Sequence, residues 1–210
     1  LGHDAQEPIR RLGVSAGLLG ECLGDLLAGR ERERKLLEGI ANQAAALGRQ
    51  WRGLVQYARI GPPVIDPAPW ALHRLVQDAL IHLVVPAGIA VRNVVPEQVR
   101  LHCDRAQVTT ALVELLRNAC AGHAEGRPSV ITVAAAQGAG TCVLTVADDG
   151  VGLAPEVRIR LFKLFSAHGP AAGAGVGLAV VRAIIAGHGG QSEVESVPGS
   201  GTTVRLTFPE

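Results

Sequence analysis

Two glycine-rich turns in the last third of the chain combine residue types that could do chemistry. Asp148 precedes Gly150 and Gly152, so its carboxylate could accept a hydrogen bond from an exocyclic amine while the glycines let a planar ring approach. The turn from Gly173 to Gly177 precedes a helical pattern, where backbone N–H groups and the positive helix end favour phosphate. Together they describe an adenine pocket beside a phosphate site. A simple Asp-Gly turn remains the alternative for the first segment alone.

A helical segment upstream adds a candidate metal ligand. The Asn118 side-chain carbonyl could ligate Mg²⁺, which usually keeps several waters and bridges to nucleotide phosphates. Glu114 lies four residues earlier on the same helical face, where it could position water or the metal. The alternative is an ordinary helix with a polar exposed face.

A candidate nucleophile stands near the start of the chain. The imidazole of His3 can attack a phosphoryl group when a neighbour fixes its tautomer and takes up the developing positive charge, and Asp4 is placed for that role. Pro8 removes a backbone donor and loosens the helix just after this pair. Taken alone, the pair is more typical of an ordinary helix end with an acidic neighbour, and the downstream motifs are what favour a nucleophile.

Two helical segments with a coiled-coil rhythm would carry His3 in residues 1–61. Their apolar seams alternate spacings of three and four, and consist of Ala5, Ile9, Leu12, Ala16, Leu19, Leu23 and Leu26, then Leu37, Ile40, Ala44, Leu47, Trp51, Leu54 and Ala58. The charged run 30–35 between them is interpreted as a solvated turn. We expect an antiparallel helical hairpin that pairs with a second copy into a dimeric four-helix bundle, since one hairpin leaves its seam partly uncovered.

A Pro-rich linker, residues 62–69, separates this hairpin from a second domain, residues 70–210. Strand and helix patterns alternate there without the regular rhythm of a doubly wound parallel sheet, which predicts an α/β sandwich with a mixed sheet. The expected helices cover 70–84, 105–121, 155–165 and 177–186, and the expected strands cover 89–95, 99–103, 130–136, 142–147, 191–196 and 202–207.

Composition narrows the function classes. Hydrophobic residues make up 48% of the 210 residues and charged residues 19%, which predicts a globular chain. Twenty basic residues against nineteen acidic ones leave no electrostatic footprint for nucleic acid or an anionic membrane. The chain has no long apolar run, and its four cysteines are scattered singly, so we expect a cytoplasmic segment with reduced thiols. It contains no Met, which suggests a piece of a longer polypeptide whose upstream input module is missing.

These motifs, in this order, resemble those of bacterial sensor histidine kinases over nearly the whole chain. The similar segments are His3-Asp4-x-x-Glu7-Pro8 (H box), Asn118 (N), Asp148-x-Gly150-x-Gly152 (G1), Phe162-Lys163-Leu164-Phe165 (F), Gly173-x-Gly175-x-Gly177-Leu178 (G2) and Gly199-x-Gly201-Thr202 (G3). The sequence around His3 is most similar to phytochrome-type kinases, which makes an upstream light-sensing module an expectation.

The resemblance implies a Bergerat-type ATP site, Mg²⁺, and transfer of the γ-phosphoryl group to His3, with Asp4 as acid-base partner. It also implies a relay to an aspartate on a response-regulator receiver domain, which would dock near Ile9, Arg10 and Leu12. The residues it would assign to nucleotide binding are Asn118, Asp148, Gly150, Gly152, Phe165, Gly173, Gly175, Val176, Gly177, Leu178 and Thr202. Glu114 joins His3 and Asp4 as a candidate catalytic residue.

The chain also departs from the family pattern. Ala121 and Gly122 stand where many members carry Lys and an aromatic residue, and Leu164 replaces a common Pro. The segment 166–172 is short for an ATP lid and has no Arg or Lys, and Glu7 stands where phosphatase-competent kinases have Thr or Asn. Two alternatives to an active kinase follow. One is a degenerate kinase that acts as a phosphotransfer, phosphatase or receiver-binding module, and the other is a non-kinase ATPase of the same fold.

Overall fold

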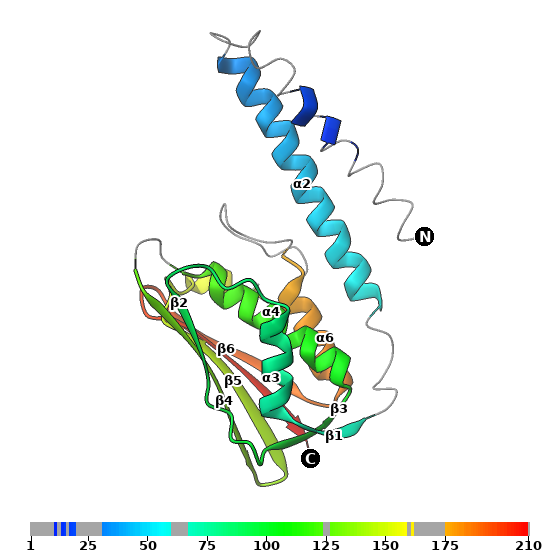
Figure 1. The fold of residues 1–210 in the computed structure, drawn as a ribbon, viewed down its shortest axis with the longest axis vertical. Coiled ribbons are helices and arrows are strands. Elements are labelled where there is room, and N and C mark those ends of the chain that lie inside the picture. The colour runs from blue at the N-terminus through cyan, green and yellow to red at the C-terminus, as the bar shows by residue number, and fades with distance from the viewer. Residues whose placement is uncertain are drawn as a thin grey trace.

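The computed structural model describes residues 11, 14–15, 17–19, 31–59, 67–123, 127–158, 161 and 175–209 (Figure 1). Its elements follow in the order α2 (Glu31–Arg59), β1 (Ala68–Ala71), α3 (Leu72–Ile81), β2 (Ile89–Asn93), β3 (Arg100–Cys103), α4 (Arg105–Ala121), β4 (Ser129–Gly138), β5 (Thr141–Asp148), α5 (Pro155–Arg158), α6 (Gly177–Gly187), β6 (Gln191–Val197) and β7 (Gly201–Pro209).

Five strands form the main sheet in the order β2-β4-β5-β7-β6. The β2–β4 pair is parallel and the other pairs are antiparallel, so the sheet is mixed as expected. Strand β1 pairs with β3 in a separate two-stranded antiparallel sheet. The last strand in the sequence, β7, is an interior strand between β5 and β6, and its first residues lie opposite the end of β5.

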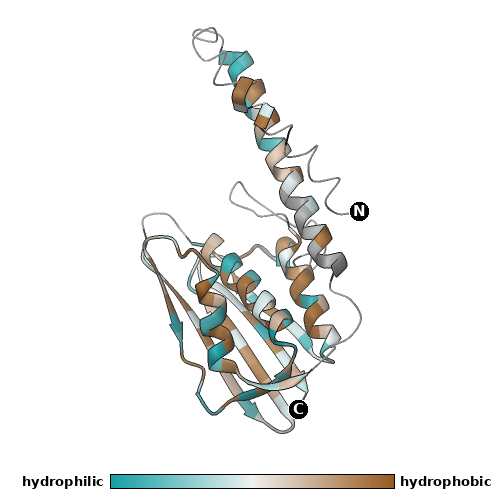
Figure 2. Ribbon diagram, turned by 45° about the vertical axis from the view of Figure 1, so that its right-hand side comes forward, coloured by the Kyte–Doolittle hydropathy of each residue, from teal (hydrophilic) through white to brown (hydrophobic). Residues whose placement is uncertain are grey.

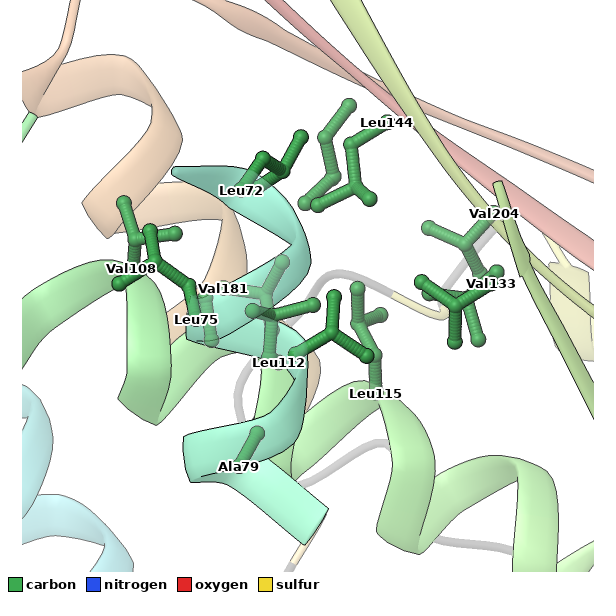
Figure 3. Close-up of a cluster of buried hydrophobic side chains, with 14 of the residues drawn as sticks. Leu72, Leu75, Ala79, Val108, Leu112, Leu115, Val133, Leu144, Val181 and Val204 are labelled. Atoms are coloured by element: carbon green, nitrogen blue, oxygen red, sulfur yellow. The ribbon is translucent and has the colours of Figure 1, made fainter. Parts of the chain in front are cut away.

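Helices α3, α4 and α6 pack on one face of the main sheet (Figure 1). Buried residues recur along them at helical spacing, for example Leu72, Leu75, Val76 and Ala79 on α3. The strands alternate, so that Cys142, Leu144 and Val146 of β5 turn their side chains into the same core. Figure 3 shows the two layers meeting, with Leu112 and Leu115 of α4 near Val133 and Val204 of the sheet. This confirms the expected α/β sandwich.

Helix α4 is fixed at its start by its sequence. The Asp104 side chain accepts a hydrogen bond from the backbone N–H of Gln107 at 3.1 Å, which caps the first turn. Arg105 pairs with Asp78 of α3 at 2.8 Å and lies 5.0 Å from the ring centroid of Trp70. These contacts hold the start of α4 against α3 and β1.

Helix α2 begins inside the charged run, which was expected to be a turn. Arg34 pairs with Glu31 at 2.9 Å within its first turns, and the run 31–35 is helical. Its residues are exposed, and the start of α2 has a hydrophilic colour in Figure 2. Leu36, Ile40 and Leu47 on α2 are 61%, 47% and 52% exposed. Most of the first predicted helix lies outside the described residues, and the hairpin and the bundle stay predictions.

Other details differ from the sequence expectations. The α/β unit begins with β1 at Ala68, inside the segment expected to be linker, and Trp70 is in this strand rather than in a helix. Cys103 and Cys120 are free thiols, and burial raises the pKa of Cys103 to about 12. None of the described helices is both long and apolar enough to span a membrane.

Candidate functional site

The candidate site is centred on Asp148, the last residue of β5. Its Oδ1 accepts hydrogen bonds from the backbone N–H groups of Gly150, at 2.9 Å, and Thr202, at 3.2 Å. Both bonds go to the same oxygen, so Oδ2 keeps its lone pairs for a further donor. The carboxylate is therefore held in one orientation by two different segments of the chain.

The Asp148 carboxyl is partly desolvated. Burial raises its pKa above the usual range for an aspartate, while the hydrogen bonds from Gly150 and Thr202 act in the opposite direction. The raised pKa means that the ionised form is less favourable in the folded protein than in the unfolded chain. A carboxylate whose ionised form is disfavoured in this way is typical of a group that accepts a hydrogen bond from a ligand.

The loop after Asp148 is hydrogen-bonded to Gly122, the residue that follows α4. The N–H of Val151 donates to the carbonyl of Gly122 at 2.9 Å, and a Cβ on Gly150 would collide with that same carbonyl. The sequence suggested that Gly150 makes room for a ring. The structure gives a different reason for this glycine, namely the close packing of two backbones.

The same loop is also joined to the turn between β6 and β7. Gly199 N–H donates to the carbonyl of Val151 at 2.7 Å, and Leu153 N–H donates to the Ser196 hydroxyl at 2.8 Å. Gly152 has a φ of +66°, and a Cβ there would collide with the carbonyl of Val197. The turns at 148–152 and 199–202 thus form one hydrogen-bonded junction around Asp148.

The Asp149 carboxylate has different hydrogen-bond partners from the Asp148 carboxylate. Because side chains alternate along an extended segment, its carboxylate turns away from Asp148. Its Oδ1 accepts from the Ser129 hydroxyl and from Val130 N–H at 2.9 Å, and these bonds lower the pKa of Asp149. Asp149 therefore anchors the start of β4 beside the end of β5.

We expect Asp149→Asn to weaken folding slightly, by about 1 kcal/mol at pH 7, because neutral partners make weaker hydrogen bonds than a carboxylate. Since the folded pKa is lowered, this stabilisation is full above the unfolded pKa, about 4, and is lost as the pH falls through the folded pKa. Urea denaturation of both proteins at several pH values between 7 and 3 measures the difference. A difference that grows towards acid pH would contradict this assignment.

Helices α4 and α6 form another side of the candidate site. Gly177, the first residue of α6, lies against α4: a Cβ there would be 2.5 Å from Glu114 Oε2 and 3.7 Å from Asn118 Nδ2. Gly175, just before, has a φ of +68°, a conformation that favours glycine. Glu114 and Asn118 are thus brought next to the turn that was expected to bind phosphate.

The geometry fits a metal only as part of a nucleotide complex. In the described ranges, no group of three or more His, Cys, Asp or Glu side chains could hold a metal ion. Asn118 is exposed and could offer one oxygen ligand, as Mg²⁺ accepts when phosphates and waters supply the rest. A dedicated protein cage for the metal is therefore not found among these residues.

Some predicted site residues are placed differently or lie outside the described part. Val176 is fully buried and Leu178 packs against the core, so the side chain of Val176 cannot touch a nucleotide and only its backbone could. Thr202 acts on Asp148 through its backbone N–H. His3, Asp4, Phe165 and Gly173 lie outside the described residues.

Sequence reasoning missed several residues that build the site. Gly122 was noted only as a departure from a pattern, although it packs on Gly150, and Ser129, Asp149 and Ser196 were not singled out. One usable signal was present, because two adjacent aspartates at a strand end must point in opposite directions. The Leu153 N–H that donates to Ser196 comes from a segment distant in sequence, which no local pattern shows.

The fold is an α/β sandwich with a mixed sheet, and comparison with known proteins gives the family. Residues 103–210 match the family model of histidine kinase-, DNA gyrase B-, and HSP90-like ATPases. The chain belongs to this ATPase family.

Among curated proteins, the chain is similar to the sensor-like histidine kinase SenX3 of Mycobacterium tuberculosis. They are 28% identical over 222 residues, covering 100% of this chain and 52% of SenX3. The chain thus spans about half the length of this relative, and less of several others.

Two solved structures share the fold. Full-length ShkA in complex with AMPPNP has a TM-score of 0.68 and 23% identity, over 100% of this chain and 44% of ShkA. The Acinetobacter baumannii histidine kinase AdeS has a TM-score of 0.63 and 20% identity, over 95% of both chains. At these identities, the likeness shows the α/β fold alone.

Proposed function

We propose that this chain is the catalytic region of a two-component sensor histidine kinase that binds Mg²⁺·ATP and phosphorylates His3. The observation that carries the proposal is the convergence of Asp148, Gly177 and the Glu114–Asn118 face of α4 around one spot of a domain in this ATPase family. The histidine kinases among its relatives support a kinase over another ATPase of the same fold.

Each residue has a role in this proposal. Asp148 Oδ2 accepts from the exocyclic amine of adenine, while the backbone of 173–177 and the start of α6 hold phosphates. Phe165 and Leu178 would border the nucleotide. Asn118 would offer its side-chain oxygen to Mg²⁺, which would neutralise phosphate charge when bound, and Glu114 would position water or the metal. In this proposal the residues mainly position the reactants and stabilise charge, and the protein takes little part in the covalent chemistry.

The proposed reaction transfers the γ-phosphoryl group of ATP to His3. A ring nitrogen of His3 bonds to the γ-phosphorus, the bond between that phosphorus and the β,γ-bridging oxygen breaks, and ADP leaves. Asp4 favours the reactive tautomer and takes up the imidazole proton. The phosphoryl group then passes to an aspartate of a response-regulator receiver domain.

The domain organisation and assembly are also part of the proposal. The sequence divides the chain into the dimerisation and phosphotransfer hairpin (1–61), the linker (62–69) and the ATP-binding domain (70–210), and β1 moves the start of that domain to Ala68. The exposure of Leu36, Ile40 and Leu47, which recur on α2 at helical spacing, supports a homodimeric bundle. An upstream sensor, phytochrome-like by the resemblance around His3, would supply the signal to this cytoplasmic region.

We expect the chain to become labelled by γ-labelled ATP and Mg²⁺, with a label that is labile to acid, and His3→Gln to remove it. A phosphoimidazole hydrolyses in acid, and Gln offers no ring nitrogen for attack. Filter-bound label before and after acid treatment measures the effect. His3→Gln should still bind ATP, because the proposed pocket lies wholly in the other domain. A label that resists acid, or that persists in the variant, would contradict the assignment of His3.

A degenerate kinase is the second candidate, and one observation favours it. Gly122 and Ala121 offer no cation to the phosphates where many members have Lys, and Gly122 instead packs on the loop after Asp148. ATP binding without any label would favour this candidate, a phosphotransfer, phosphatase or receiver-binding module.

A further inference from the structure

The carboxylate of Glu114 is held between its own helix and the start of α6. Its Oε1 accepts from Arg117 Nη1 at 2.5 Å, and its Oε2 faces Gly177, where a Cβ would lie 2.5 Å away. The two oxygens therefore have different partners. One is held by a guanidinium, and the other lies at the wall of the proposed phosphate site.

The pair differs from an ordinary ion pair on a helix surface. Exposed pairs at this spacing usually contribute little to stability, because both side chains stay in water. Here the Arg117 side chain is 57% exposed, whereas the Glu114 side chain is only 12% exposed. The guanidinium thus reaches from solvent to a largely buried carboxylate, where screening is weaker and the orientation is better fixed.

The contacts around Gly177 indicate the role of this orientation of the Glu114 carboxylate. Gly177 borders both Glu114 and Asn118, and the missing side chain at Gly177 is what lets α6 come this close to α4. A glutamate has three rotatable side-chain bonds, so without a partner on Oε1 its carboxylate could turn out of this contact. Arg117 removes that freedom by binding one oxygen and leaving the other towards α6 and Asn118.

We propose that Arg117 is a positioning residue, which holds the Glu114 carboxylate against the start of α6 and so sets the geometry of the phosphate end of the site. The inference rests on the proposed function and deepens it, since it assigns a role to a side chain that would touch neither ATP nor His3. It predicts that loss of Arg117 slows the transfer step and leaves nucleotide binding almost unchanged.

The test compares autophosphorylation of the chain and its variants under single-turnover conditions with γ-labelled ATP and Mg²⁺. We expect Arg117→Gln to slow the maximal rate roughly 10-fold, because a displaced positioning group costs rate rather than affinity. The ATP concentration for half-maximal rate should stay within about twofold. Arg117→Lys keeps the cation and should recover much of the rate.

Arg105→Gln is the matched control, because Arg105 is also on α4 and also pairs with a carboxylate, Asp78, at 2.8 Å, away from Gly177. Its rate should equal that of the parent chain. An unchanged rate in Arg117→Gln would overturn the inference, as would equal losses in the Gln and Lys variants or a loss confined to ATP affinity. A parent chain that takes no label overturns the proposed function, and the inference with it.

Discussion

Asp148→Asn should lower ATP affinity by about 100-fold or more and shift the preference towards inosine triphosphate. The N–H groups of Gly150 and Thr202 both point at Oδ1, so an asparagine would keep its oxygen there and turn its NH₂ group to the ring site. That group would face the amine of adenine, donor against donor, and such a mismatch costs about 3 kcal/mol. Inosine carries an acceptor oxygen at the same ring position.

The same variant should be at least as stable as the parent chain. The raised pKa of Asp148 means that its ionisation disfavours folding, and this cost is full above the folded pKa and absent below the unfolded one. Removing the charge at pH 7 removes the cost. The gain in melting temperature should therefore shrink as the pH falls.

Titration calorimetry with ATP and with inosine triphosphate, and melting curves at two pH values, measure both effects. Asp149→Asn is the matched control, since it changes the adjacent carboxylate, which bonds to Ser129 and Val130. It should keep its preference for ATP. If both variants lose ATP equally, or if Asp148→Asn unfolds the protein, Asp148 is a structural residue.

The second large effect is expected at Gly201, where β7 begins. Its φ is +91°, and a Cβ would collide with the backbone carbonyl of Asp148, which cannot turn aside as a side chain can. Strain and collision together should lower the free energy of unfolding of Gly201→Ala by about 3 kcal/mol or more. Because Thr202 follows directly, its hydrogen bond to Asp148 should also lengthen and ATP affinity should fall.

Gly199 offers a control in the same turn. It also has a positive φ, +80°, but a Cβ there would have no atom within 4 Å among those described. Gly199→Ala should therefore lose only about 1 kcal/mol, the cost of the backbone conformation. Urea denaturation of both variants measures the difference. Equal losses would show that the contact with Asp148 is unimportant.

The fold was largely predictable because its elements carry strong local patterns. The buried residues of α4 and α6 recur at helical spacing, and β5 alternates cleanly between buried and half-buried residues. Strand β1 was missed because its four residues have no such pattern. It exists through non-local contacts, namely its pairing with β3 and the stacking of Arg105 on Trp70.

The sequence predicted which residues belong to the candidate site better than it predicted why each of them is needed there. Glycine spacing pointed to Gly150 and Gly177, yet each is a glycine because another segment, at Gly122 or Glu114, packs against it. Only the folded chain brings those segments together. Arg117 illustrates the limit further, since an exposed arginine in a helix carries no signal of the buried carboxylate that it binds.

The interior position of β7 has a consequence for synthesis of the chain. Residues 201–209 fill the gap between β5 and β6, so the sheet cannot close until these residues have left the ribosome. Until then the opposing edges of β5 and β6 are unpaired and open to aggregation. Gly201 and Thr202 come with the same segment, and thus the nascent chain should bind no ATP before its fold is complete.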